Sequence, residues 1–201
     1  MMEDSVKKVD INITSAPRMY DIMVSDAVVF TTFSFMFCAA GLGWFPADAA
    51  FSLGVIQVTL AGLFFVGARE RAKFNQFWGN VNFIFVFCFG VFGGVTNLLT
   101  GLGIPLNGVV LSIPNLVVGA VMLCTLPGVR HDPWTGSVMY ALAAIAVFFL
   151  GLAGIGILTP VLNCIASICL GGVGILGFWS IVITLNGFTG FNLPAGKPLF
   201  K

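Results

Sequence analysis

The sequence predicts an all-α integral membrane protein, a bundle of six transmembrane helices with both termini in the cytoplasm. Three observations predict this class: few charged residues, six long apolar segments, and cations confined to one side of the resulting topology. Charged residues make up 8% of the chain and hydrophobic residues 58%, and the mean hydropathy is +1.04. Because soluble chains carry about 25% charged residues, too few remain here to cover a water-facing surface.

The six apolar segments are separated by turns or polar loops, and each is long enough to cross a bilayer. Residues 108–126, for example, would form a helix of about 28 Å, close to the ~30 Å hydrocarbon core. The predicted segments are residues 27–45, 49–68, 77–99, 108–126, 136–158 and 161–185. The chain is thereby divided into a cytoplasmic N-terminal tail (1–20), a transmembrane domain (21–186) and a cytoplasmic C-terminal tail (187–201).

Each segment has recognisable ends. Asp21 and Asp26 come ahead of the first, and Pro46-Ala47-Asp48 turns the chain into the second. The cationic stretch 69–73 is predicted to be a loop between the second and third. Glycines and Pro105 end the third, the polar loop 127–133 ends the fourth, and Thr159-Pro160 separates the last two. Proline and glycine are expected at such ends because they interrupt regular helix.

Lysine and arginine set the orientation. All nine lie in the N-terminal tail, in the loops after the second and fourth segments, or in the C-terminal tail. The other three connections carry one charged residue, Asp48. Because short loops rich in Lys and Arg stay in the cytoplasm during insertion, both tails are predicted to be cytoplasmic. The cell membrane, plasma or inner, is the expected location.

Enzymatic chemistry finds little support. No ionisable residue lies in the middle of a predicted span, where proton relays usually place one. The single histidine, His131, lies in a loop, and no nucleophile, paired-carboxylate or phosphate-loop motif occurs. We therefore expect no enzyme, no cofactor and no metal site, and a net charge of +1 gives no reason to expect nucleic-acid binding. The five cysteines are expected to fill helix interfaces.

Neutral polar residues and glycines are the other features of the spans. A buried amide without a partner costs several kcal/mol, so the polar residues are expected either to bond between helices or to line a pore. The candidates are Asn80, Asn82, Asn115, Asn163, Thr31 and Thr32. Glycine clusters such as 90–94, 151–156 and 171–177 let helices approach closely. These clusters are expected either to pack helices within one chain only or to form an interface between copies as well.

Several short motifs resemble those of the acetate uptake transporter family. The resemblance extends from the first span to the C-terminal tail. It is carried by Phe30-Thr31-Thr32-Phe33, Phe45-Pro46-Ala47-Asp48, Asn75-Gln76-Phe77-Trp78-Gly79 and Leu193-Pro194-Ala195-Gly196. The family's Asn-Pro-Ala/Val-Pro-Leu-Gly-Leu signature ahead of the first span is largely replaced here, and Ala16-Pro17 is what remains of it.

The resemblance implies a homo-oligomer, a hexamer, in which each protomer has its own pore for acetate and related small monocarboxylic acids. Some members of the family also move protons. Membrane lipid and the monocarboxylate substrate are the implied partners. By position, the implied constriction consists of Phe30, Phe85 and Phe148, and the entrance of Ala16, Pro17 and Asn75.

Two other functions fit the same composition. One is a channel for a neutral solute such as urea, a short amide or ammonia, because aromatic constrictions without buried charge suit those solutes equally well. The other is a non-transporting structural subunit of a larger membrane complex, which the altered N-terminal signature favours.

Overall fold

The computed structural model describes residues 20–46 and 48–198, and within these ranges the chain is helical with no strand. Four helical stretches are long and apolar enough to cross a membrane: Ala49–Ala72, Gln76–Gly101, Trp134–Gly154 and Thr159–Phe188. Two shorter apolar helices, Asp26–Gly41 and Gly108–Cys124, accompany them. The prediction of an all-α protein with apolar, membrane-compatible helices is confirmed at this level.

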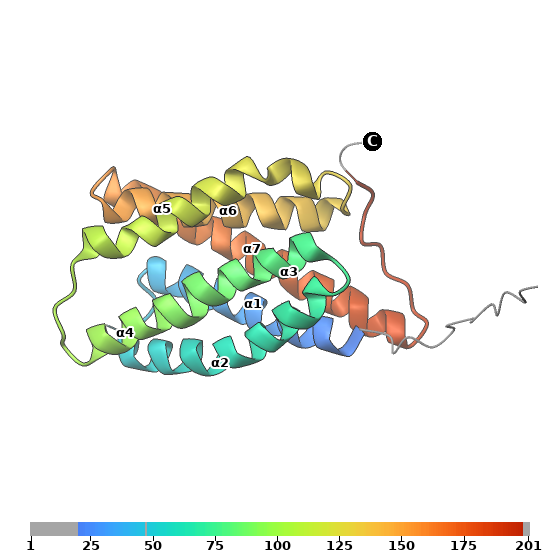
Figure 1. Ribbon diagram of the computed structural model, residues 1–201, viewed down its shortest axis with the longest axis horizontal. Coiled ribbons are helices and arrows are strands. Elements are labelled where there is room, and N and C mark those ends of the chain that lie inside the picture. The colour runs from blue at the N-terminus through green and yellow to red at the C-terminus, as the bar shows by residue number, and fades with distance from the viewer. Residues whose placement is uncertain (1–19, 47, 199–201) are drawn as a thin grey trace, which may run out of the picture.

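The elements follow one another with short connections (Figure 1). The third predicted segment forms three consecutive elements, because a π-helix interrupts it. In chain order the elements are α1 (Tyr20–Gly41), α2 (Ala49–Ala72), α3 (Gln76–Phe85), η1 (Val86–Phe92), α4 (Gly93–Gly101), α5 (Gly108–Cys124), η2 (Leu126–Val129), α6 (Trp134–Gly154) and α7 (Thr159–Phe188).

Two predicted boundaries are wrong, and both errors concern charged residues. Asp26 does not precede the first helix but lies inside α1, and its side chain is 2% exposed. Arg69 and Arg71 do not lie in a loop but in the last turn of α2. Cations are favourable there because the carbonyl end of a helix carries a partial negative charge. A prediction from hydropathy ends each segment at its first charged residue. The backbone stays helical beyond that residue when the charge has a favourable partner.

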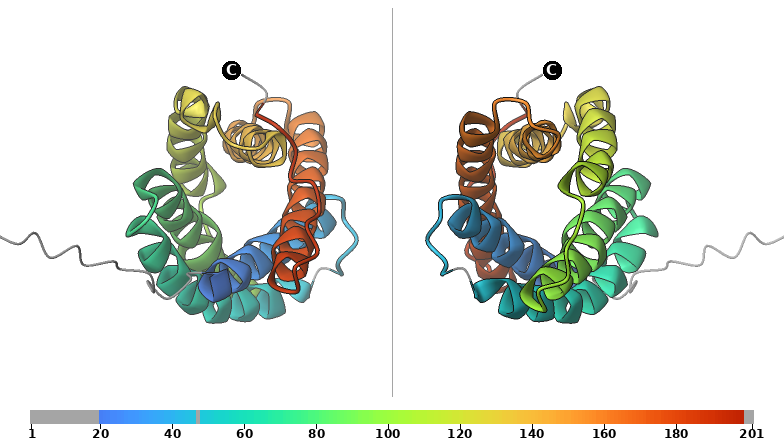
Figure 2. Two further views of the ribbon diagram at one scale, coloured as in Figure 1. Left: turned by 90° about the vertical axis from the view of Figure 1, so that its right-hand side faces the viewer. Right: turned by 90° about the vertical axis from the view of Figure 1, so that its left-hand side faces the viewer.

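The helices form a ring when the molecule is viewed end-on (Figure 2). Around the ring, α1 packs between α2 and α7, α6 packs between α5 and α7, and α2 packs against α3, η1 and α4. Contacts between α5 and η1 complete the circuit. The α2–α3 connection, the η2 region and the C-terminal segment all lie at one end of the bundle, at the right of Figure 1. The cations of the described residues therefore share one end.

Glycines bring neighbouring helices of this ring together. A Cβ atom on Gly151 of α6 would lie 2.6 Å from the backbone nitrogen of Leu116 in α5. A Cβ atom on Gly174 of α7 would lie 2.8 Å from the ring of Phe35 in α1. Such distances are far inside van der Waals contact, so Gly151, which faces backbone, requires glycine, and a side chain at Gly174 would displace the Phe35 ring. Packing within the chain thus accounts for these glycines without a second copy.

The π-helix η1 is joined to α2 by a buried amide. Gln57 is fully buried, and its Nε2 donates to the carbonyl oxygen of Phe89 at 2.5 Å. The Oε1 of Gln57 accepts from Nδ2 of Asn97 at 2.6 Å. A π-turn disturbs the regular backbone hydrogen bonding of a helix, and a side chain from a neighbouring helix can satisfy a carbonyl there. Gln57 therefore stabilises the irregular turn that follows Phe85.

Replacement of Gln57 tests this role. We expect Gln57→Leu to lower the free energy of unfolding by roughly 1–3 kcal/mol, because the Phe89 carbonyl and the Asn97 amide lose their partner. The matched control is Thr59→Val, an exposed position of the same helix whose hydroxyl bonds only the Val55 carbonyl. Thermal unfolding in detergent measures both, and equal melting temperatures for the two variants would contradict the role.

Candidate functional site

A cavity of about 400 Å³ is enclosed by helices of the ring near its cationic end, where Asp26, Arg71 and Asp132 line it. This volume is within the ~300–1,000 Å³ typical of small-molecule sites. Helices α1, α2, α3, α6 and α7 and the C-terminal segment contribute to its walls. The side chains that matter for its chemistry are Asp26, Phe30, Phe64, Arg71, Trp78, Asn82, Phe85, Asp132, Thr135, Ser180 and Thr184.

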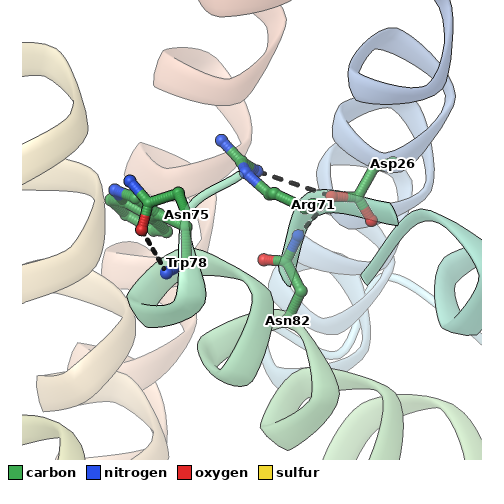
Figure 3. Close-up of polar contacts among 5 residues, drawn as sticks. All are labelled: Asp26, Arg71, Asn75, Trp78 and Asn82. Carbon is green, nitrogen blue, oxygen red and sulfur yellow. Dashed lines mark hydrogen bonds and ion pairs between the residues drawn. The ribbon is translucent and has the colours of Figure 1, made fainter. Parts of the chain in front are cut away.

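An ion pair with an amide beside it forms one wall of the cavity (Figure 3). Arg71 in α2 donates through Nη1 to Oδ2 of Asp26 in α1 at 3.4 Å. The amide of Asn82 in α3 donates to the same oxygen. Asp26 fits there because Gly67 of α2 faces it without a side chain: a Cβ atom on Gly67 would lie 2.9 Å from Oδ1 of Asp26. Three helices thus meet at one carboxylate.

Trp78 connects this group to the start of α6. Its ring lies 5.4 Å from the guanidinium carbon of Arg71, within the ~6 Å range of a cation–π contact. Its Nε1 donates to Oδ2 of Asp132 at 2.7 Å. The helix that carries Trp78 begins at a proper cap, since Oδ1 of Asn75 accepts from the backbone nitrogen of Trp78 at 3.1 Å. The cap therefore fixes the start of α3, from which the indole reaches both charged partners.

Phenylalanine rings form the deep end of the cavity. The rings of Phe30 and Phe85 lie 4.6 Å apart between centroids, and those of Phe30 and Phe64 lie 6.2 Å apart. Phe85 stacks on Phe89 at 5.5 Å, which extends the aromatic cluster toward the middle of the bundle. The cavity is consequently polar near the end of the ring and apolar where it meets these rings.

The C-terminal segment runs along the rim of the ring, from the end of α7 to the start of α6, and joins the cavity wall (Figure 2). Thr135 donates through Oγ1 to the carbonyl of Ala195 at 3.1 Å, and the backbone nitrogen of Trp134 donates to the carbonyl of Lys197 at 3.1 Å. Gly196 has a positive φ of 88° and lies against the indole of Trp134. The Leu193-Pro194-Ala195-Gly196 motif is therefore part of the site.

The residues predicted from the sequence fall into three groups. Phe30, Phe85 and Asn82 line the cavity, and Asn75 caps the helix beside it. Phe148 lies outside the cavity on the face of α6 that meets Gly119 of α5, whereas Thr135 and Met139 are the α6 side chains that line the cavity. Of the remaining residues, Asn80 is exposed and Asn115 and Asn163 are half-buried. Thr31 is buried beside Gly177, and Thr32 bonds the Val28 carbonyl. Ala16 and Pro17 lie outside the described residues.

Among the site residues that were not predicted, Asp26, Arg71, Trp78 and Asp132 form the charged wall. From the sequence, Asp26 and Arg71 mark segment ends, Arg71 also counts as a cytoplasmic cation, and Asp132 is a polar loop residue. The sequence did contain a signal for the ion pair. In a topology with both tails on one side, Asp26 at the start of the first span and Arg71 at the end of the second lie at the same end of neighbouring helices. Trp78 carried no such signal beyond its place in the Asn75 motif.

No family model, curated protein or solved structure matches the chain. The site is therefore interpreted from its own geometry. Among the described residues, no group of three or more His, Cys, Asp or Glu side chains is placed to hold a metal ion.

A second carboxylate beside Asp26 tests the charge balance of the site. We expect Asn82→Asp to destabilise the fold by about 3 kcal/mol, because it adds a buried charge next to Asp26 that Arg71 alone must offset. The loss should be larger at pH 8 than at pH 5, since at the lower pH one of the two adjacent carboxyl groups can hold a proton. Thermal unfolding at the two pH values measures this.

Asn80→Asp is the matched control for this change. Asn80 lies two residues earlier on the same helix, is exposed, and donates to the Gln76 carbonyl. Because Asn80 lies in the second turn of α3, close to the end of the bundle, a carboxylate there should cost much less stability than one at position 82. A similar loss in both variants, or no pH dependence for Asn82→Asp, would contradict the proposed charge balance.

Proposed function

We propose that the chain spans the membrane with six helices, with both termini in the cytoplasm, and passes acetate and related small monocarboxylic acids through the centre of the ring. One observation carries the proposal: Phe30 and Phe85 lie 4.6 Å apart at the apolar end of a cavity whose other end is charged. These are the residues of the first and third spans that the resemblance implies as a constriction. A homohexamer with one passage in each protomer is part of the same proposal.

The aromatic cluster determines which form of the acid passes. Removing water from a carboxylate in an apolar ring costs several kcal/mol even after relaxation. Protonating a carboxylic acid with a pKa of about 4.3 at pH 7 costs roughly 3.7 kcal/mol. The neutral acid is therefore the less costly form at Phe30 and Phe85, where the described lining carries no charge.

The cavity wall favours a carboxylic acid over a neutral amide. Arg71 contributes a guanidinium to the lining, and this group matches the two oxygens of a carboxylate. Urea or a short amide could accept a hydrogen bond from it but has no negative charge to pair with it. A non-transporting subunit would have no use for a cavity that joins a charged wall to an apolar end.

Flux through liposomes containing the purified protein tests the function. We expect acetic acid to enter faster than urea, and acetate uptake at constant total concentration to rise steeply between pH 7 and pH 5, because the share of neutral acid rises. Liposome swelling and labelled acetate measure the two quantities, with protein-free liposomes to subtract passive permeation. Protein-dependent uptake that is equal at both pH values, or faster for urea, would contradict the proposal.

Removal of the Phe85 ring tests the constriction. We expect Phe85→Ala to increase the flux of acetate and to reduce discrimination against urea, because the ring that meets Phe30 is lost. Stability should fall by about 3–5 kcal/mol, as for other buried Phe→Ala changes. Phe87→Ala is the control, because Phe87 lies two residues away and is 52% exposed. Unchanged urea flux in a folded Phe85→Ala protein would locate the barrier elsewhere.

A further inference from the structure

Asp26 is held in an unusual way for a carboxylate in an apolar bundle. Its side chain is 2% exposed, and its Oδ2 accepts from both Arg71 and Asn82. Its Oδ1 is also buried but has no hydrogen-bond partner among the described residues. Ionised carboxylates usually use both oxygens, so half of the bonding capacity of this group is unused. Oδ1 is therefore a place where a proton can be carried.

Arg71 is also incompletely used. A guanidinium has five N–H donors, and Asp26 accepts from one nitrogen at 3.4 Å, longer than the ~2.7–2.9 Å of a strong charge-assisted bond. The Arg71 side chain is 25% exposed and lines the cavity. Trp78 supports its face, and Asn82 presents an amide donor to the same point. Donors suited to a carboxylate thus converge on the cavity wall.

We propose that Arg71 and Asn82 form a carboxylate-binding site, which Asp26 occupies from within the chain and releases to a substrate carboxylate when Asp26 takes up a proton. In this exchange the Arg71–Asp26 ion pair breaks, a proton from solvent binds a carboxyl oxygen of Asp26, and Arg71 pairs with the incoming anion. The substrate class rests on the proposed function.

Charge balance explains why the anion would need the proton. The charged groups that line the cavity around Asp26 are Arg71 from α2 and Asp132 from the loop before α6. Helix α3 contributes the neutral Asn82 and Trp78, and α7 contributes the hydroxyls of Ser180 and Thr184. With Asp26 ionised, two carboxylates already surround one guanidinium. An anion alone would add a third, whereas an anion with a proton on Asp26 leaves the total unchanged.

Binding of acetate to the purified full-length protein tests the exchange without any membrane. We expect wild-type protein to bind acetate more tightly at pH 5.5 than at pH 7.5, although acetate is mostly ionised at both. Asp26→Asn should bind about tenfold more tightly than wild type at pH 7.5 and lose most of the pH dependence, because Arg71 is then unpaired. Arg71→Gln should abolish binding at both pH values. Isothermal titration measures all of these.

Two matched variants serve as controls. Asp48→Asn removes an exposed carboxylate in the α1–α2 turn, and Arg69→Gln removes an exposed cation from the same turn of α2 as Arg71. Both should bind acetate as wild type does. The wild-type comparison at two pH values needs no variant, so the proposal stays testable even if Asp26→Asn or Arg71→Gln fails to fold.

The outcomes separate this inference from the proposed function. Absence of acetate binding at either pH, equal affinity at both, or wild-type affinity for a folded Asp26→Asn protein would overturn the exchange, whatever the flux. Binding with the expected pH dependence but no acetate flux in liposomes would overturn the transport proposal and leave the carboxylate site standing.

Discussion

Hydrocarbon offers no water to a buried polar group, and this constraint accounts for the arrangement of polar side chains in the chain. Most hydroxyls within the helices bond a carbonyl one turn earlier, as Ser167 does with Asn163 at 2.7 Å. Gln57 satisfies the carbonyl at the π-turn. The charged groups with partners on other elements, Asp26, Arg71 and Asp132, gather where the cavity lies. Most polar side chains of the bundle thus bond a local carbonyl, bond a neighbouring helix as Gln57 does, or line the cavity.

The helices could be predicted from the sequence because the backbone hydrogen bonds of each helix lie within it and its apolar residues are continuous along the chain. Five of the six predicted segments start within two residues of the start of a helix in the structure; the first starts seven residues inside α1. The position of Asp26 could not be predicted in this way. Its partner Arg71 is 45 residues away along the chain, so the pair exists only once α1 packs against α2. A segment-by-segment hydropathy pattern contains no information about that contact.

The aromatic residues of the site could be predicted from the sequence only in part. Phe30 and Phe85 could be placed by the motifs next to them, and the structure brings their rings together. Phe148 had no adjacent motif to fix its position on α6. Successive residues of a helix differ by about 100° in direction, so an error of one or two positions turns a side chain away from the ring's interior. Met139, more than two turns earlier, faces the cavity instead.

The hydrogen bond between Thr135 and the Ala195 carbonyl has a practical consequence for work with this protein. Ala195 is six residues from the end of the chain and is part of the cavity wall. A purification tag or fluorescent fusion joined shortly after Ala195 would therefore be tethered close to the cavity. Transport or binding assays with such fusions should include protein from which the added sequence has been cleaved.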